Sequence, residues 1–521
     1  MSSKKGITML FTVILIVLLI AGCSTKKDVS TNDNETGEGS KDGGTLVIVR
    51  LSDADNLDHQ FSSTINAVSV THRKVYEGLV GRDKNSEIQP LLAKEWKQLD
   101  DTTWEFKLRE DVKFHDGTPF NADAVKATFD RLLDPNVGSP RAVVLKMVNE
   151  IKVVDEHTVQ FILSQPFAPL LSILANHEGG IINPTMIEKY GKKSIQEPSG
   201  TGPFVFEKWT PGQEIVLNKN EDYWGEKPKL DKVVFKVVPE ETTRISMVET
   251  GEAHIAEPLS VAMLDTVEAS QNSEVYRSEA FGTEFVAFNV QKAPFNDSRV
   301  RKAISHAIES DSIIEGVFNN AGSKANSLLG SKVFGYHKGL KASEYNLNEA
   351  KKLLAEAGYP QGFEATLKTM DNKERVNLAE VLQSQLKGIG INLTIQVLEY
   401  GTFIEQINTG DTEMFINSWR NATGDADYNQ YNLLHSSSHG PHGNTFFYSN
   451  KEVDSLIEAA RAEKDENKRI ELYAKAQEIE LDEAVYIPVR VIENLAAVSK
   501  KVEGFDISPS GYLEINDISI K

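Results

Sequence analysis

The sequence contains one cysteine, Cys23, in 521 residues. A single thiol cannot form an intramolecular disulfide, and it cannot build the cysteine-rich sites that hold structural zinc. The chain also lacks a Walker loop and a dinucleotide-binding glycine motif. We therefore expect no disulfide framework and no cofactor.

Positive charge is scarce as well. The chain has 56 lysines and arginines against 76 aspartates and glutamates, which gives a net charge of −20. Because phosphate backbones are bound by clustered Lys and Arg, nucleic acid is not an expected partner. The hydrolase motifs Gly-x-Ser-x-Gly and His-Glu-x-x-His are absent from the sequence. A surface peptide hydrolase is therefore kept only as a weaker alternative to a binding protein. We expect neither enzyme activity nor catalytic residues.

The main uncharged apolar stretch, residues 9–22, follows Lys4 and Lys5. A basic start, a short apolar core and small residues before Cys23 are typical of a secretory signal, and the run is too short for a comfortable membrane span. The ending Leu19-Ile-Ala-Gly-Cys23 resembles the lipobox of bacterial lipoproteins, which implies cleavage before Cys23 and lipidation of that residue. An uncleaved anchor helix is the alternative.

We expect residues 1–22 to be a signal peptide and residues 23–43 to be a lipidated flexible tether. The tether assignment rests on a segment after Cys23 that is almost entirely polar and cannot form a core. The lipid anchor would hold the protein at the outer face of a bacterial cell membrane, or on the periplasmic side in a Gram-negative cell.

The rest of the chain has the composition of a soluble globular protein, and its length requires at least two lobes. Alternating or apolar patterns predict strands at 45–50, 103–109 and 391–397, and helical stripes interleave with them. This order favours α/β lobes. Helices are expected at 68–79, 122–133, 300–310, 347–357, 378–389 and 453–483.

Five segments resemble, in order, those of the family 5 extracellular solute-binding proteins, the peptide, nickel and glutathione receptors of ABC importers. The segments are 92–96 with 104–125, Gly200-Thr-Gly-Pro-Phe204, Asn220-Glu-Asp-Tyr-Trp-Gly225, 295–304, and 472–477 with 486–488. The resemblance covers the chain after Gly43. We expect the polar pairs within these segments, His115 with Asp116 and Tyr223 with Trp224, to be structural.

This resemblance implies an α/β, two-lobed periplasmic-binding-protein-like (Venus-flytrap) fold of type II, with an extra subdomain in the first lobe. The expected divisions are 44–72, 200–283 and 490–521 for lobe I, 73–199 for the extra subdomain and 284–489 for lobe II. The chain would cross between lobes near 281–289 and 488–493. It also implies a monomer that passes its ligand to ABC permease and ATPase subunits.

The segment 413–429 is the strongest candidate for the binding site. Apolar alternation over 414–419 predicts a strand, and Gly424 with two aspartates ends it. Loops held by rigid strands commonly carry binding residues. The alternative is a capped strand end followed by a solvated acidic loop.

A planar guanidinium suits a two-point contact with a carboxylate, so we expect Arg420 to hold a ligand carboxylate. Asp425 or Asp427 would meet the ligand ammonium. An internal ion pair between Arg420 and either acid is the alternative. The other predicted ligand-binding residues are the cleft walls Trp419 and Phe281 and the neutral or turn residues Thr283, Asn421, Thr423 and Gly424.

The resemblance also bears on the ligand. Thr369 stands where dipeptide receptors of the family carry an arginine, and Asn421 and Ala422 stand where they carry an acid. The segment 419–427, followed by 444–454, is more similar to the glutathione-binding branch. We expect glutathione or a short peptide, with a general di- or oligopeptide receptor or a nickel-complex receptor as alternatives.

A loop with three histidines, His435, His439 and His442, could suggest a metal site, since histidine is a common metal ligand. The loop contains Gly and Pro and no carboxylate. We expect a solvated loop and no metal.

Overall fold

The computed structural model describes residues 43–521 of the chain. The predicted signal peptide, the predicted lipidation site Cys23 and all of the predicted tether except Gly43 lie outside this range. Over 43–521, helices that combine the length and the apolarity needed to cross a bilayer are not found.

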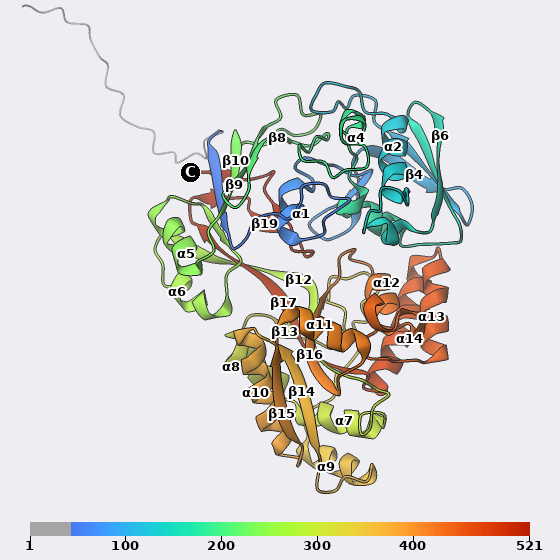
Figure 1. The fold of residues 1–521 in the computed structure, drawn as a ribbon, viewed down its shortest axis with the longest axis vertical. Helices are drawn as coiled ribbons and strands as arrows, with labels where there is room; N and C mark the ends of the chain where they lie inside the picture. The colour runs from blue at the N-terminus through green and yellow to red at the C-terminus, as the bar shows by residue number, and fades with distance from the viewer. Residues whose placement is uncertain (1–42) are drawn as a thin grey trace, which may run out of the picture. The chain divides into compact units, whose positions relative to one another are not determined.

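A single eleven-stranded sheet runs through both lobes (Figure 1). Its order is β15-β14-β16-β12-β17-β11-β1-β10-β9-β8, with β13 added beside β17. The long strands β12 (Ser273–Phe288) and β17 (Tyr486–Ser499) pair antiparallel and carry the chain between the lobes. Their pairing is irregular between Glu279 and Thr283 and again between Glu284 and Phe285. Both predicted crossing segments fall in these two strands.

Lobe I is built on β1 (Thr45–Arg50), which lies parallel to both β10 (Lys232–Val237) and β11 (Ile255–Glu257). Phe204, Leu217 and Phe235 contribute to its buried core. The remaining α-helices and strands of this lobe are α1 (Ile65–Thr71), β8 (Phe204–Thr210), β9 (Glu214–Lys219), α5 (Glu241–Thr250), α6 (Leu264–Glu268), β18 (Val502–Glu503), β19 (Asp506–Ile507), β20 (Leu513–Glu514) and β21 (Ser519–Ile520).

The predicted helix 68–79 is wrong in its second half, because α1 ends at Thr71. Beyond it, the backbone of 74–75 bonds instead to a distant turn: Gly202 N donates to Val75 O (3.0 Å) and Phe204 N to Lys74 O (2.9 Å). A Cβ at Gly202 would lie 2.3 Å from Lys74 O, so only glycine permits this approach. Long-range pairing thus overrides the local helical pattern.

The expected structural pairs lie at the same junction. Glu77 is buried and accepts hydrogen bonds from Thr201 Oγ1 (2.8 Å), Tyr223 OH (2.7 Å) and Trp224 Nε1 (2.9 Å). One ring nitrogen of His115 lies 2.9 Å from Gly202 O. These groups join lobe I to the extra subdomain, which fits a structural role.

The extra subdomain has its own four-stranded sheet, ordered β4-β5-β7-β6, and a core that includes Phe106, Phe129 and Phe161. The predicted strand is confirmed as β5 (Thr103–Leu108), and the predicted helix as α2 (Ala122–Leu133). Asn121 caps α2 through its side chain. The other elements are β2 (Val80–Arg82), β3 (Ile88–Pro90), β4 (Ala93–Gln98), β6 (Val148–Asp155), β7 (Thr158–Leu163), α3 (Leu170–Leu174) and α4 (Pro184–Tyr190).

Lobe II places helices on both faces of β14 (Glu364–Met370), β15 (Asn392–Leu398) and β16 (Met414–Arg420). One face packs Met414 and Ile416 against α7 (Ser298–Ala307), α8 (Ser310–Phe318), α9 (Leu347–Glu356) and α10 (Lys373–Lys387). The other face packs Phe415 and Trp419 against α11 (Tyr400–Thr409), α13 (Lys451–Ala462) and α14 (Glu466–Asp482). The predicted helix 453–483 is therefore two helices, and Asp465 caps the second.

Candidate functional site

The carboxyl ends of parallel strands mark where an open α/β sheet binds its ligand. In lobe I, β1 ends at Arg50 and is followed by Leu51, which is 50% exposed. In lobe II, β14 and β16 are parallel, and β16 ends at Arg420. Arg420 Nη1 donates to Asn494 Oδ1 on β17 at 2.8 Å. The end of β16 therefore meets the lobe I part of the crossing strands.

Arg420 is exposed to solvent, although protein surrounds it on most sides. This crowding, together with the charge of Arg490, lowers the pKa of its guanidinium. Arg420 is therefore an exposed cation with partly desolvated surroundings.

The loop after β16 is organised by Asn421. Its Oδ1 accepts from the backbone N of Thr423 (3.0 Å) and of Gly424 (2.7 Å), and its Nδ2 donates to Asp425 O (2.7 Å). Gly424 has φ +67°, and a Cβ there would lie 2.8 Å from the buried ring of Phe281. The conformation of the loop is therefore fixed by Asn421, Gly424 and Phe281.

Both aspartates of the loop have internal partners. Arg469 Nη2 lies 2.9 Å from Asp425 Oδ1 and 3.0 Å from Oδ2, and Arg461 Nε lies 2.8 Å from Asp427 Oδ1. Burial raises the pKa of Asp427 to about 6, against the opposing effect of Arg461. The acids therefore pair with helices α13 and α14, and Arg420 pairs with an amide.

Trp419 and Arg420 lie on opposite faces of the sheet, because successive residues of a strand point to opposite sides. Arg420 continues the face of β16 that carries Met414 and Ile416, whereas Trp419 continues the face of Phe415. The Trp419 ring packs 5.9 Å from the ring of Tyr428.

Thr283 and Thr369, also singled out by the sequence, are both fully buried. Thr283 Oγ1 donates to Leu328 O at 2.9 Å. Thr369 lies within β14. Both side chains are enclosed in lobe II.

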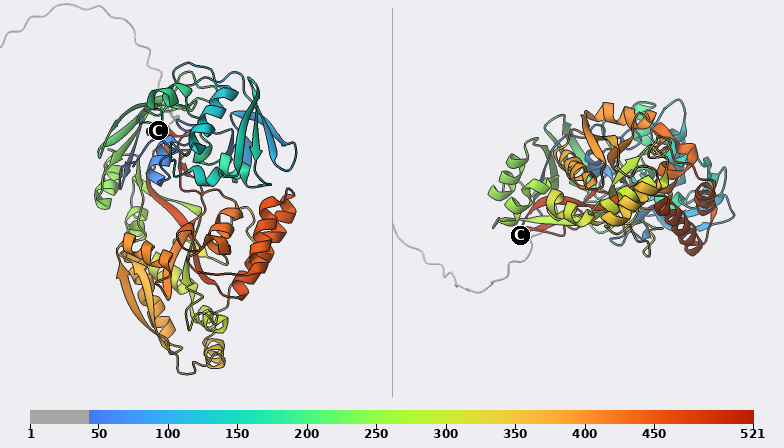
Figure 2. Two further views of the ribbon diagram at one scale, coloured as in Figure 1. Left: turned by 45° about the vertical axis from the view of Figure 1, so that its right-hand side comes forward. Right: turned by 90° about the horizontal axis from the view of Figure 1, so that it is seen from below.

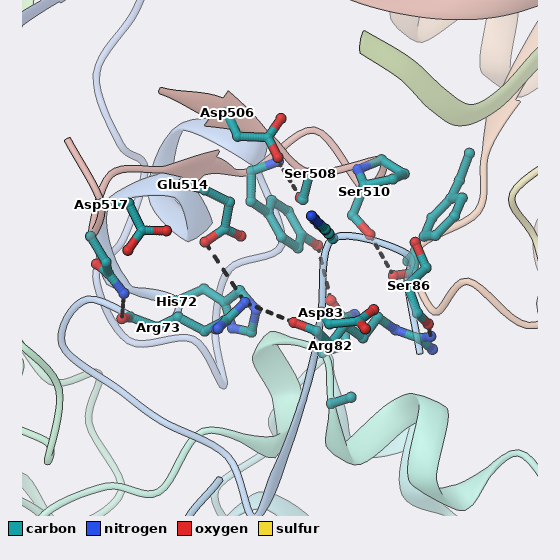
Figure 3. Close-up of a pocket in the computed structure, with 18 of the residues that line it drawn as sticks. His72, Arg73, Arg82, Asp83, Ser86, Asp506, Ser508, Ser510, Glu514 and Asp517 are labelled. Atoms are coloured by element: carbon teal, nitrogen blue, oxygen red, sulfur yellow. Dashed lines mark hydrogen bonds and ion pairs between the residues drawn. The ribbon is translucent and has the colours of Figure 1, made fainter. Parts of the chain in front are cut away.

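A cavity of about 260 Å³ lies where the loop meets lobe I and the extra subdomain (Figure 3). Of the predicted residues only Phe281 lines it, beside Ala422 of the loop. Its charged wall groups are Arg73, Arg82, Lys84, Asp83, Asp506, Glu514 and Asp517. Figure 3 shows Arg73 between Glu514 and the backbone of Arg82. The cavity is polar and carries both signs of charge.

Contacts across the lobes hold the loop in place. Arg82 Nη2 donates to Thr423 O, and Ser172 Oγ donates to Asp425 Oδ2 at 3.3 Å. Ala168 N donates to Arg461 O at 2.8 Å, so the carboxyl end of α13 sits beside the extra subdomain (Figure 2).

The side chain of Arg461 makes one further contact across the lobes and one within lobe II. Its guanidinium lies over the rings of Phe167 (5.1 Å) in the subdomain and Tyr431 (3.7 Å) in lobe II. The residue that pairs with Asp427 therefore also joins the two parts of the protein.

Sequence reasoning missed a second polar cluster beside the cavity. Arg141 forms an ion pair with the buried Glu178, whose Oε2 also accepts from Asn176 Nδ2 at 2.7 Å. Tyr512 OH donates to Asn176 Oδ1 at 3.2 Å, and both of these residues line the cavity. No local pattern could have found the cluster, because its members come together only through the tertiary fold.

The prediction of a solvated histidine loop is wrong for His435, whereas His439 is half-buried. His435 is buried, with one ring nitrogen 2.7 Å from Ser437 Oγ and the other 3.2 Å from Glu458. A ring nitrogen of His439 lies 2.7 Å from Tyr448 O. The loop packs because Gly440 and Gly443 allow its tight turns. Within 43–521, no three His, Cys, Asp or Glu side chains are grouped to hold a metal ion.

Comparisons with known proteins agree over most of the chain. The profile of the bacterial extracellular solute-binding proteins, family 5 (middle), matches residues 87–441. Glutathione-binding protein GsiB from Shigella flexneri is 33% identical over 458 residues, which is 86% of this chain and 89% of that protein.

Two solved structures extend the comparison to the fold. The periplasmic binding protein DppA from Helicobacter pylori, solved with the peptide STSA, has a TM-score of 0.77 and 30% identity, and the match covers 92% of this chain and 98% of that chain. HbpA2 from Haemophilus parasuis has a TM-score of 0.84 and 26% identity, and the match covers 92% and 100%. These matches show the two-lobed periplasmic-binding-protein fold of type II.

Proposed function

Since the chain belongs to the family 5 bacterial extracellular solute-binding proteins, we propose that it captures glutathione or a similar short peptide between its lobes for import by an ABC transporter. The proposal includes a lipid anchor at Cys23, a monomeric receptor, and delivery of the ligand to permease and ATPase subunits. No catalytic step and no metal are part of it.

The observation that carries the proposal is the position of Arg420. It is exposed at the carboxyl end of β16, and its only hydrogen-bond partner among residues 43–521 is the neutral amide of Asn494. Since no acid neutralises it, the guanidinium is available to a ligand carboxylate.

The ligand ammonium needs a different partner from the one expected at first. Asp425 and Asp427 are engaged by Arg469 and Arg461, so in this proposal they support the loop. Acids on the cavity wall, such as Asp83, Asp506 and Asp517, would face the ammonium instead.

Two relatives favour different members of the ligand class. GsiB is named for glutathione binding, and the Helicobacter pylori protein was solved with a peptide. Glutathione is our first candidate, and a short ordinary peptide is the second.

Calorimetric titration tests the proposal. Protein lacking residues 1–43 is partly unfolded to remove carried-over ligand, refolded, and titrated with glutathione, a dipeptide mixture and Ni²⁺ in parallel. Micromolar or tighter binding of glutathione supports the first candidate, and binding of dipeptides alone supports the second. Binding of neither refutes the proposal.

The role of Arg420 has its own test. Arg420→Ala should weaken binding of the preferred ligand by about 10- to 100-fold, the range expected for a hydrogen bond to a charged group. The matched control is Arg299→Ala, which should bind as the wild type does. Arg299 is an exposed residue of α7 whose ion-pair partner is Asp297. Equal affinity in the two variants would remove Arg420 from the site.

A further inference from the structure

Four side chains form a row across the sheet at the point where it passes between the lobes. Lys324 on β13 (Ser323–Lys324) is opposite Arg490 on β17, Arg490 is opposite Glu284 on β12, and Glu284 is opposite Ser418 on β16. Directly paired residues share one face of a sheet. The row therefore places two cations and one carboxylate side by side.

A third cation reaches the same carboxylate from a helix. Arg375 of α10 lies with Nε 2.7 Å from Glu284 Oε1, and Arg490 Nε lies 2.9 Å from Oε2. Arg375 Nη2 also donates to Ser418 Oγ at 2.7 Å. All three charged groups are buried, so one carboxylate is shared between two buried guanidiniums.

Arg420 extends this cluster on the same face. It is opposite Gly282, two positions from Glu284, and a Cβ at Gly282 would lie 2.9 Å from Arg420 Cγ. The missing side chain at Gly282 leaves room for the stem of Arg420. The charge of Arg490 lowers the pKa of both Arg420 and Arg375, in each case together with burial.

The charges of this cluster do not balance. Lys324, Arg375, Arg420 and Arg490 provide four positive charges. Among the described residues, Arg375 and Arg490 contact one carboxylate, Glu284, and Glu374 also acts on Arg375. Like charges held together in a poorly solvated site are stabilised when an anion enters.

We infer that this hinge cluster is an anion subsite that makes the receptor select ligands with more carboxylates than ammonium groups. The inference rests on the proposed function and narrows it. Glutathione has two carboxylates and one ammonium, whereas an ordinary dipeptide has one of each. The subsite would hold one glutathione carboxylate at the exposed guanidinium of Arg420. Arg490 is buried, donates through Nη1 to Ala321 O at 2.7 Å and lies 3.5 Å from the centre of the Phe318 ring, so it would act on the carboxylate through its charge and not by contact.

A charge cycle between protein and ligand tests this inference. The ligands are glutathione, its glycine ethyl ester, in which one carboxylate is neutral, and a zwitterionic dipeptide. Lys324→Gln removes one exposed charge of the cluster, and Lys352→Gln, on the exposed surface of α9, is the matched control. Arg490→Lys keeps the charge of a buried residue but loses the planar guanidinium.

We expect Lys324→Gln to weaken glutathione binding by about 3- to 10-fold and dipeptide binding by less than twofold, because only the excess carboxylate feels the lost charge. Glutathione affinity should also fall less steeply with salt in this variant. Arg490→Lys keeps the positive charge, so it should change the loss of affinity on esterification less than Lys324→Gln does. Unfolding curves identify any variant that has lost its fold.

Three outcomes overturn the inference: an equal ester penalty in the wild type and both variants, glutathione affinity unchanged in Lys324→Gln, or tighter wild-type binding of the dipeptide than of glutathione. In each case a wild-type protein that binds glutathione or peptide leaves the proposed function standing. A wild type that binds none of the three ligands refutes the proposed function itself.

Discussion

The buried pair between Asp425 and Arg469 gives the sharpest prediction about the loop. Asp425 is 1% exposed and Arg469 5%, and both carboxylate oxygens lie within 3.0 Å of Arg469 Nη2. Asp425→Asn keeps the size of the side chain and leaves Arg469 as an uncompensated buried charge. Breaking such a pair costs about 3–5 kcal/mol.

Two other contacts of Arg469 reduce the free-energy cost of losing Asp425. Arg469 also lies over the ring of Phe334 at 4.7 Å and donates through Nε to Ala460 O at 3.1 Å. We therefore expect a loss near the lower end, about 3 kcal/mol. Urea titration of ligand-free protein measures it. The double variant Asp425→Asn with Arg469→Met removes both charges and should recover most of the lost stability, because a buried pair can be replaced by apolar groups at little cost.

The ligand titration then separates two roles of Asp425. If Asp425 supports the loop, Asp425→Asn lowers the free energy of unfolding, and the double variant regains both stability and ligand affinity. A single variant that is as stable as the wild type but has lost ligand binding would refute this reasoning. It would return Asp425 to the role of ammonium partner.

Two further predictions concern backbone strain and pH. Gly424→Ala should cost about 1–3 kcal/mol and weaken ligand binding, because φ is +67° and the added Cβ meets Phe281; Gly191→Ala, with φ +58° and open space around it, should leave binding unchanged. Burial lowers the pKa of His59 from 6.5 to about 4, so its contribution to stability is complete above pH 6.5 and is lost as the pH falls towards 4. His59→Phe should flatten the stability profile between those values, measured by urea titration across pH, and an unchanged slope would contradict the assignment.

Local patterns predicted much of the fold. The helix predicted at 122–133 and the strand predicted at 391–397 match α2 and β15 to within one residue at each end. The segment 68–79 failed because its last half bonds to Gly202 and Phe204, far along the chain. The apolar pattern of a segment reports only on that segment, whereas the backbone carbonyls of 74–75 accept hydrogen bonds from a distant one.

The loop after β16 shows the same limit at the level of chemistry. The sequence placed Arg420 near two aspartates and suggested either a ligand site or an internal pair. The structure gives those aspartates to Arg461 and Arg469, which lie on later helices. The hinge cluster needs register across four strands as well as a helix, and no spacing in the sequence encodes it. Pairing partners from distant elements are a property of the tertiary fold.

Arg461 has a consequence for the timing of ligand release. It accepts a hydrogen bond from Ala168 across the lobes while its guanidinium steadies Asp427. A receptor of this fold opens by swinging its lobes about the hinge, and that motion would break the bond to Ala168 and remove the Phe167 ring. The loop would then lose part of its support at the moment the cleft widens. Ligand entry and ligand release would both pass through this open form, so the lifetime of the closed complex would depend on a contact that never touches the ligand.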